Sequence, residues 1–187
     1  PKVSITWLLE DAPIRFAELG CDIWSKIGKP KDDTLIVREI AKVERLIVAA
    51  PDLLQDHTVK RPSDLTGLPC AALGPFEGAS IPLTHSKGQS ETVAASVALA
   101  TNNIFSSHKA ALMGVGYAVL PYWFVAEDVK QGRLIDVLPN WRAPELTITT
   151  SYLPSQRRVR RLQAFMQAME STISAMEGTH SIGNSAS

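Results

Sequence analysis

Short polar side chains gather at one point of the chain, where an apolar helix is expected to begin. Asn102 and Asn103 precede the expected helix Ile104–Met113, and Ser106 and Ser107 follow in its first turn. An asparagine side chain can accept the unpaired backbone N–H groups at a helix N-terminus, and those groups, together with the helix dipole, also attract anions. Two interpretations stay open: these residues only cap the helix, or they also bind a carboxylate or another small anion.

The other chemically active residue types are too scattered to predict a catalytic or metal site. The histidines are His57, His85, His108 and His180. None of their separations matches the spacing of metal ligands. No Ser–His–Asp set and no Cys–His pair can be argued from spacing either, so the sequence predicts no catalytic residue, no metal and no cofactor.

Composition limits the kind of protein further. Hydrophobic residues make up 45% of the chain and charged residues 20%, which is typical of a globular domain. Basic and acidic residues both number 19, and this balance argues against a broad nucleic-acid-binding face. No apolar run is long enough to span a membrane, so no membrane contact is expected. A reducing compartment is the simple interpretation of the cysteines, and we expect a cytoplasmic protein. Cys21 and Cys70 lie outside any CxxC motif and predict free thiols, with a redox-sensing pair as the alternative.

One basic run stands out from this balanced composition. Arg157, Arg158, Arg160 and Arg161 open the last expected helix. A solvated helix face is the simpler interpretation, and contact with DNA or a partner protein is the alternative. Because positive charge is unfavourable at a helix N-terminus, an acidic partner is expected close by.

Helices and strands alternate along the chain. The expected helices are Pro13–Leu19, Ile104–Met113, Tyr122–Gln131 and Arg157–Ser174. The expected strands are Lys2–Leu9, Cys21–Trp24, Leu35–Ile40, Val43–Ala50, Cys70–Leu73, Ile81–His85, Glu91–Ala100, Tyr117–Leu120, Leu134–Leu138 and Glu145–Leu153. This alternation predicts an α/β fold with largely parallel sheets.

Two apolar strands, ending at Ala50 and Leu120, enclose the middle of the chain. A segment enclosed in this way can be a domain inserted into another, with the two strands as crossovers. We therefore expect lobe I to comprise residues 1–50 and 121–176 and lobe II residues 51–120. The polar tail 177–187 is expected to be disordered. Ligands of such folds bind where strand ends and helix starts converge.

Several segments stand in the order found in one known family. They are Gly20–Gly28, Asp33–Ile40, Leu46–Leu54, Arg61–Gly67, Ala110–Pro121 and Gly132–Pro139, followed by the final helix. In this order they resemble the effector-binding (regulatory) domain of LysR-type transcriptional regulators. The resemblance implies a two-lobed fold similar to the type 2 periplasmic binding proteins, with two crossover strands. It also implies that a small effector, often an anionic metabolite, binds in the inter-lobe cleft and regulates transcription without catalysis.

The resemblance adds candidate effector contacts to the helix start. The candidates are Asn103, Ile104, Phe105, Ser106, Asp11, Pro13, Ala49, Ala50, Leu120 and Pro121. The first four match the family's cleft-lining turn, against capping or core packing as the plainer roles. Asp11 and Pro13 begin the helix after the first strand, although an acidic residue there disfavours an anion. The last four are hinge positions, where we expect backbone contacts.

The resemblance also carries expectations about the whole protein. Family members have an N-terminal winged helix-turn-helix, a linker helix, and a strand and helix ahead of the segment matching Lys2–Leu9. None of these is in the sequence, so we expect an N-terminally truncated chain that reaches DNA only through the absent winged helix-turn-helix. Members assemble through antiparallel lobe contacts, which predicts a dimer here and a tetramer at full length. A solute-binding protein of a transporter and an enzyme on the same fold are the alternatives.

Overall fold

The computed structural model describes residues 3–9, 16, 20–74 and 80–182 of the chain. The chain divides into two compact units, one of Pro1–Val43 with Leu146–Ser187 and one of Glu44–Glu145. Within the described residues, no helix is both long and apolar enough to cross a lipid bilayer.

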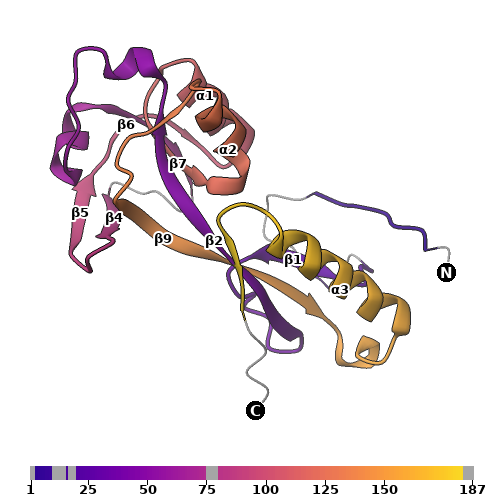
Figure 1. The fold of residues 1–187 in the computed structure, drawn as a ribbon. Helices are drawn as coiled ribbons and strands as arrows, with labels where there is room; N and C mark the ends of the chain where they lie inside the picture. Colours follow the sequence, from indigo (N-terminus) through magenta and orange to yellow (C-terminus); the bar gives the residue numbers. More distant parts are fainter. Residues whose placement is uncertain (1–2, 10–15, 17–19, 75–79, 183–187) are drawn as a thin grey trace. The chain divides into compact units, whose positions relative to one another are not determined.

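The elements are labelled as in Figure 1. The strands are β1 (Trp24–Ile27), β2 (Ile36–Ala49), β3 (Pro69–Leu73), β4 (Ser80–His85), β5 (Ser90–Ala94), β6 (Ser96–Thr101), β7 (Ala118–Pro121), β8 (Ile135–Asp136), β9 (Trp141–Tyr152) and β10 (Thr179–Ser181). The α-helices are α1 (Ile104–Leu112), α2 (Tyr122–Lys130) and α3 (Arg160–Ser174). Short 3₁₀ helices are η2 (Pro51–Leu54), η3 (Pro62–Gly67) and η4 (Pro154–Gln156).

The first unit is an antiparallel sheet covered by α3. Strand β1 pairs with the second half of β9, and β10 pairs with residues 41–43 of β2. Helix α3 presents Leu162 and Met166, one turn apart, to a small core that includes Tyr152 of β9. This burial follows from the apolar stripe in the α3 sequence, because residues four apart lie on one face of a helix.

The second unit is built on a mixed sheet. Strands β3 and β6 run parallel, and β7 joins β3 through a parallel bridge between Cys70 and Tyr117. On its other side β7 pairs antiparallel with residues 45–48 of β2. Helices α1 and α2 pack against β7, as Figure 1 shows. The hairpin β4–β5 adds to the beginning of β9.

Alternate residues of these strands enter two different cores. In β2, Ile47 belongs to one core and Leu46 to the other. The same alternation places Val119 of β7 in the first core and Leu120 in the second. The sheet is therefore covered on both faces, which explains why Leu46–Ala50 is apolar at every position.

Several elements differ from the sequence expectations. Strands expected at Leu35–Ile40 and Val43–Ala50 form the single strand β2. Residues Val3–Leu9 form no strand, and the apolar side chains Ile5 and Trp7 are exposed, because no described strand pairs with this segment. Thr179–Ser181 pair with β2, so the expectation of disorder fails for that part of the tail.

The compact units also have other bounds than the expected lobes. The strands with residues in both units are β2 and β9, while β7, which ends at Leu120 and Pro121, lies wholly inside the second unit. Strand β7 pairs antiparallel with β2 within this unit. The sheets are mainly antiparallel: among the described strands only β3 and β6 pair in parallel, and Tyr117, just before β7, adds a single parallel bridge to Cys70.

Candidate functional site

The start of α1 is fixed by two successive hydrogen bonds. Thr101, the last residue of β6, accepts the backbone N–H of Asn103 on its Oγ1 at 3.1 Å. The Oδ1 of Asn103 in turn accepts the backbone N–H of Ser106 at 3.1 Å. Asn103 has an extended backbone at φ −107° and ψ 121°, as an N-cap residue requires. The expected capping role of Asn103 is confirmed.

This helix start carries unneutralised positive potential. Among the described residues no acceptor contacts the backbone N–H of Ile104 or Phe105, and the first turn contains no acidic residue. Unpaired N–H groups and the helix dipole together favour a bound anion. The geometry can therefore hold a carboxylate through backbone donors, beside the hydroxyl of Ser106.

The α1 start also stands at the carboxyl end of parallel strands. Leu73, the last residue of β3, is in register with Thr101, the last residue of β6. The N–H of Gly74 donates to the carbonyl of Thr101 at 2.8 Å, which ties the two strand ends together. Ligands of α/β sheets bind beyond such carboxyl ends. The position of this turn beyond the strand ends and its unpaired N–H groups thus both favour a ligand at the start of α1.

The residues of this turn have unequal roles. Phe105 is 67% exposed and meets the ring of Phe124 edge-on at 5.3 Å between centroids. Ile104 packs against the second core of the unit and is half-buried. Ser107 is fully buried and donates from Oγ to the carbonyl of Ala71 at 2.8 Å, so it anchors α1 to β3. Asn103, Phe105 and Ser106 are the side chains of this turn that a ligand can reach.

The remaining candidates are not presented in this way. Ala49, Ala50, Leu120 and Pro121 are buried in the sheet of the second unit. Their side chains are packed, which agrees with the expectation that any contact from these positions is made by the backbone. Asp11 and Pro13 lie outside the described residues. The structure therefore brings together one group of candidates, at the start of α1, and an effector role for all of them stays a prediction.

A polar cluster that the sequence did not reveal joins α1 to α2. His108 Nε2 lies 2.8 Å from Asp128 Oδ2, and Arg133 Nε donates to Asp128 Oδ1 at 2.6 Å. Burial alone would raise the pKa of Asp128, but hydrogen bonds from Arg133 and His108 and their charges outweigh it, so the pKa is lowered. Asp128 is thus an ionised clamp. The spacing of 20 residues between His108 and Asp128 gives no local signal for it.

This cluster is the acid–base pair nearest to a catalytic arrangement in the described residues. A hydrolytic triad would need a nucleophile in contact with His108. The neighbouring hydroxyl of Ser107 donates to a backbone carbonyl, and the ring of His108 packs on Phe124 at 5.0 Å. The cluster is therefore built to hold two helices together.

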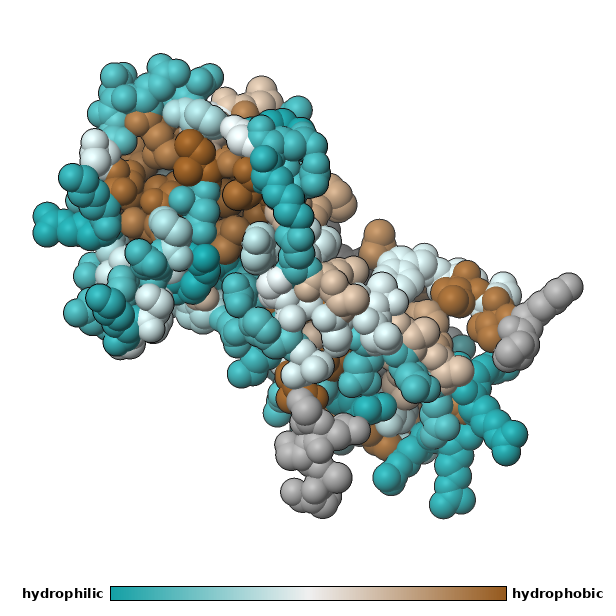
Figure 2. Space-filling view, viewed as in Figure 1, coloured by the Kyte–Doolittle hydropathy of each residue, from teal (hydrophilic) through white to brown (hydrophobic). Residues whose placement is uncertain are grey.

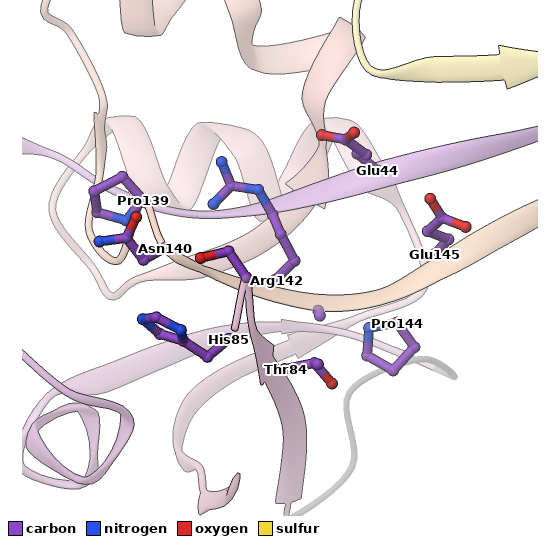
Figure 3. Close-up of a pocket in the computed structure, with 10 residues that line it drawn as sticks. Glu44, Thr84, His85, Pro139, Asn140, Arg142, Pro144 and Glu145 are labelled. Atoms are coloured by element: carbon purple, nitrogen blue, oxygen red, sulfur yellow. The ribbon is translucent and has the colours of Figure 1, made fainter. Parts of the chain in front are cut away.

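A second concave region lies elsewhere in the second unit. It is a pocket of about 460 Å³. Figure 3 shows Glu44 and Glu145 at one end of it and Pro139 and Asn140 at the other. Its volume suits a small ligand, but most of the residues that line it are charged or polar, whereas ligand sites are usually lined mainly by hydrophobic and aromatic side chains. None of the candidate effector residues lines it.

The cationic group in this pocket is already engaged. Arg142 lies 3.2 Å from Asp136 Oδ2 and donates to the carbonyl of Trp141 at 2.9 Å. Burial raises the pKa of Asp136, with the charge of Arg142 opposing that effect. The His85 ring accepts the N–H of Lys87 on Nδ1 at 3.0 Å and meets Trp141 edge-on. Among the described residues that line the pocket, the one arginine is thus already paired, so the pocket offers an anionic ligand less than its volume suggests.

The described part of the chain offers no group of metal ligands. No three His, Cys, Asp or Glu side chains within it lie close enough to hold a metal ion. Within this part of the chain neither Cys21 nor Cys70 forms a disulfide bond, and Cys70 is buried in the first core.

Comparison with known proteins decides the family. The model of the LysR substrate binding domain matches residues 1–173. The chain belongs to that family. As a LysR substrate-binding domain it shares the α/β, type 2 periplasmic-binding-protein-like fold, as the sequence resemblance implied.

Curated relatives of this LysR substrate-binding domain are named as transcriptional regulators. The chain is 29% identical to the HTH-type transcriptional regulator PtxR of Pseudomonas aeruginosa, covering 90% of the chain and 54% of the relative. It is 26% identical to the HTH-type transcriptional regulator DmlR of Escherichia coli, covering 89% of the chain and 56% of the relative. The chain thus spans about half the length of the curated relatives it matches.

Solved structures agree on the fold. The full-length virulence activator AphB of Vibrio cholerae superposes with a TM-score of 0.72 at 18% identity, covering 88% of this chain and 56% of that one. The regulatory domain of CrgA from Neisseria meningitidis gives a TM-score of 0.68 at 18% identity, covering 83% of this chain and 77% of that one.

Proposed function

We propose that this LysR substrate-binding domain is the effector-sensing part of a transcriptional regulator and that it binds a small organic anion at the start of α1. The observation that carries the proposal is the pair of unpaired backbone N–H groups at Ile104 and Phe105, in a first turn without an acid and at the carboxyl ends of two parallel strands. Asn103 holds these donors in place. Ser106 adds a hydroxyl, and Phe105 adds an exposed apolar surface.

Calorimetry with a panel of small mono- and dicarboxylates tests the site. Two variants at one position separate anion binding from helix capping. Asn103→Ser keeps a capping oxygen without adding charge, whereas Asn103→Asp keeps the cap and places a negative charge within a few ångströms of the anion. Repulsion of about 1–4 kcal/mol at such a distance predicts that Asn103→Asp weakens binding at least about five-fold. Asn103→Ser should bind nearly as the parent does.

The result that contradicts the proposal is equally direct. If a carboxylate binds and Asn103→Asp leaves its affinity unchanged, the anion does not sit at the α1 start. If no member of a broad anion panel raises the unfolding temperature or gives a heat of binding, the domain does not sense an organic anion. A neutral ligand that binds would then correct the class of effector.

The wider assignment extends the same proposal. Binding of the effector would bias the arrangement of a regulator that reaches DNA through an N-terminal winged helix-turn-helix. The other candidate contacts, Asp11, Pro13 and the buried sheet positions named above, remain proposed contributors. We also propose that lobe I comprises residues 1–50 and 121–176 and lobe II residues 51–120. We further propose that the domain forms a dimer through antiparallel lobe contacts and that the protein is cytoplasmic.

Names of the relatives favour regulation over the two alternatives. The curated relatives are transcriptional regulators, whereas a solute-binding protein or an enzyme would be expected to match transport proteins or catalysts. We therefore propose that the domain acts without catalysis. Turnover of any bound carboxylate by the purified chain, followed by chromatography, would contradict this.

A further inference from the structure

Four exposed arginines stand within five residues at the start of α3. They are Arg157, Arg158, Arg160 and Arg161, here called the arginine patch. Figure 2 shows hydrophilic side chains projecting from the region of the first unit where Figure 1 draws the beginning of α3. The patch is the densest run of one charge in a chain whose net charge is zero.

The described residues do not include the acidic partner expected from the sequence. Among the described residues no carboxylate forms an ion pair with any arginine of the patch, and the first turn of α3 contains no acidic residue. Asp22, which contacts the preceding 3₁₀ helix, accepts a hydrogen bond from Gln156 at 2.8 Å instead. Glu170, further along α3, lies 3.6 Å from Arg38.

The arrangement is locally unfavourable for the folded domain by itself. Val159 provides no side-chain cap for α3, so the unpaired N–H groups of the first turn add positive potential to four like charges. Surface charges that repel one another and have no ion-pair partner among the described residues are explained most simply by a negative partner outside the domain. Guanidinium groups present planar forks that match phosphate oxygens two at a time.

We propose that the arginine patch docks on the phosphate backbone of double-stranded DNA as a sequence-independent contact. This inference rests on the proposed function, in which another part of the protein holds the domain on DNA. Tethering makes the second contact intramolecular, so an intrinsically weak contact becomes effective. DNA is favoured over an acidic protein surface because it is the polyanion that the proposed function already places beside the domain.

The zero net charge of the chain limits how strong this contact is. A patch of four cations releases at most four counterions, so the slope of log K against log salt should lie near −3.6 if all four contact phosphates. Binding should then weaken on the order of 100-fold between 50 and 200 mM salt. The dissociation constant in low salt should fall in the range of non-specific binding, roughly 10⁻⁴ to 10⁻⁶ M.

Fluorescence anisotropy of the 187-residue chain with a labelled duplex of arbitrary sequence tests the patch. The test variant replaces all four arginines of the patch with Gln. The matched control replaces four exposed lysines with Gln and so removes the same charge: Lys31, Lys60, Lys87 and Lys109. We expect the test variant to lose at least ten-fold in affinity and most of the salt slope, while the control changes less than three-fold.

Additional measurements test whether the test variant still folds, whether positive charge alone is enough for binding, and whether the partner is DNA or an acidic protein. Because all four side chains are exposed and repel one another, the test variant should unfold at or slightly above the temperature of the parent. Four Arg→Lys replacements should keep the salt slope. Equal losses in the test and control variants, or no duplex binding by the parent in low salt, would overturn the proposal. Binding of poly-glutamate as tightly as the duplex would overturn it too, in favour of an acidic protein.

Failure of this inference can be distinguished from failure of the proposed function. Calorimetry with small anions tests the start of α1, which belongs to the second unit. The duplex-binding assay tests the arginine patch, which belongs to the first unit. A test variant that still binds its anion but not the duplex fits both proposals. A parent that binds an anion but no duplex rejects the patch alone.

Discussion

Gly116 lies where two strand backbones approach too closely for any side chain. A methyl carbon at this position would stand 2.6 Å from the carbonyl oxygen of Pro69 and 2.8 Å from its carbon. Two hydrogen bonds join β3 to this segment. The carbonyl of Pro69 accepts the N–H of Tyr117 at 2.9 Å, and the N–H of Ala71 donates to the carbonyl of Tyr117 at 2.8 Å. Since the obstructing atoms are backbone, Gly116→Ala must push β3 and β7 apart.

The cost of Gly116→Ala can be estimated from what the strands lose. Overpacking of a core typically costs about 1–3 kcal/mol. Weakening two hydrogen bonds adds roughly 1–2 kcal/mol, because each contributes about 0.5–1.5 kcal/mol. The free energy of unfolding should therefore fall by about 2–5 kcal/mol, which lowers the unfolding temperature by roughly 4–20 °C for a chain of this size.

Thermal and urea unfolding followed by circular dichroism measure this effect. Gly67→Ala is the matched control, because an added methyl group at Gly67 meets nothing within 4 Å and its φ is not in the left-handed region. The control should remain within about 0.5 kcal/mol of the parent. A Gly116→Ala protein as stable as the Gly67→Ala protein would refute the close approach of β3 and β7, and with it the sheet that supports the α1 start.

Three further perturbations address the same unit. Asn103→Ala should lower the free energy of unfolding by about 1 kcal/mol relative to Asn103→Ser in urea titrations, because only serine keeps the cap; equal stabilities would contradict the capping bond. Ser107→Ala should cost about 1–3 kcal/mol by the same measurement, because it removes the donor to the buried carbonyl of Ala71, and a neutral result would contradict that anchor. The lowered pKa of Asp128 stabilises the fold above the pKa of an unfolded aspartate, and this contribution is lost as the pH falls below about 4. Stability of Asp128→Asn should therefore fall less steeply than that of the parent between about pH 4 and pH 2, and parallel curves would contradict the clamp.

Local signals in the sequence predicted the elements around the candidate site well. Helix α1 was expected at Ile104–Met113 and spans Ile104–Leu112, with Asn103 as its cap and Gly114 at φ +70° beyond its end. A capping side chain and a glycine with positive φ act within a few residues, so their effect can be read from the sequence. The expected apolar strand before Pro121 was also found, because its run of apolar residues is likewise a local signal.

Pairings between distant residues could not be read in this way. The alternation of Val3–Leu9 is a strand pattern, but a strand also needs a partner, and no described strand provides one. Thr179–Ser181 look like a polar tail and become a strand because β2 offers an open edge. The clamp of His108, Asp128 and Arg133 is likewise a product of helix packing.

Charge recognition and effector specificity are separable at the proposed site. The unpaired donors for an anion are backbone N–H groups of Ile104 and Phe105, fixed by the cap on one side and by the Ser107 anchor on the other. Backbone donors do not depend on side-chain identity, so they attract anions of many kinds. Discrimination among anions must then come from the side chains around those donors, of which the exposed ring of Phe105 offers the largest apolar contact in the turn. Replacing Phe105 should therefore change which anion binds, whereas adding a negative charge at Asn103 should weaken all of them.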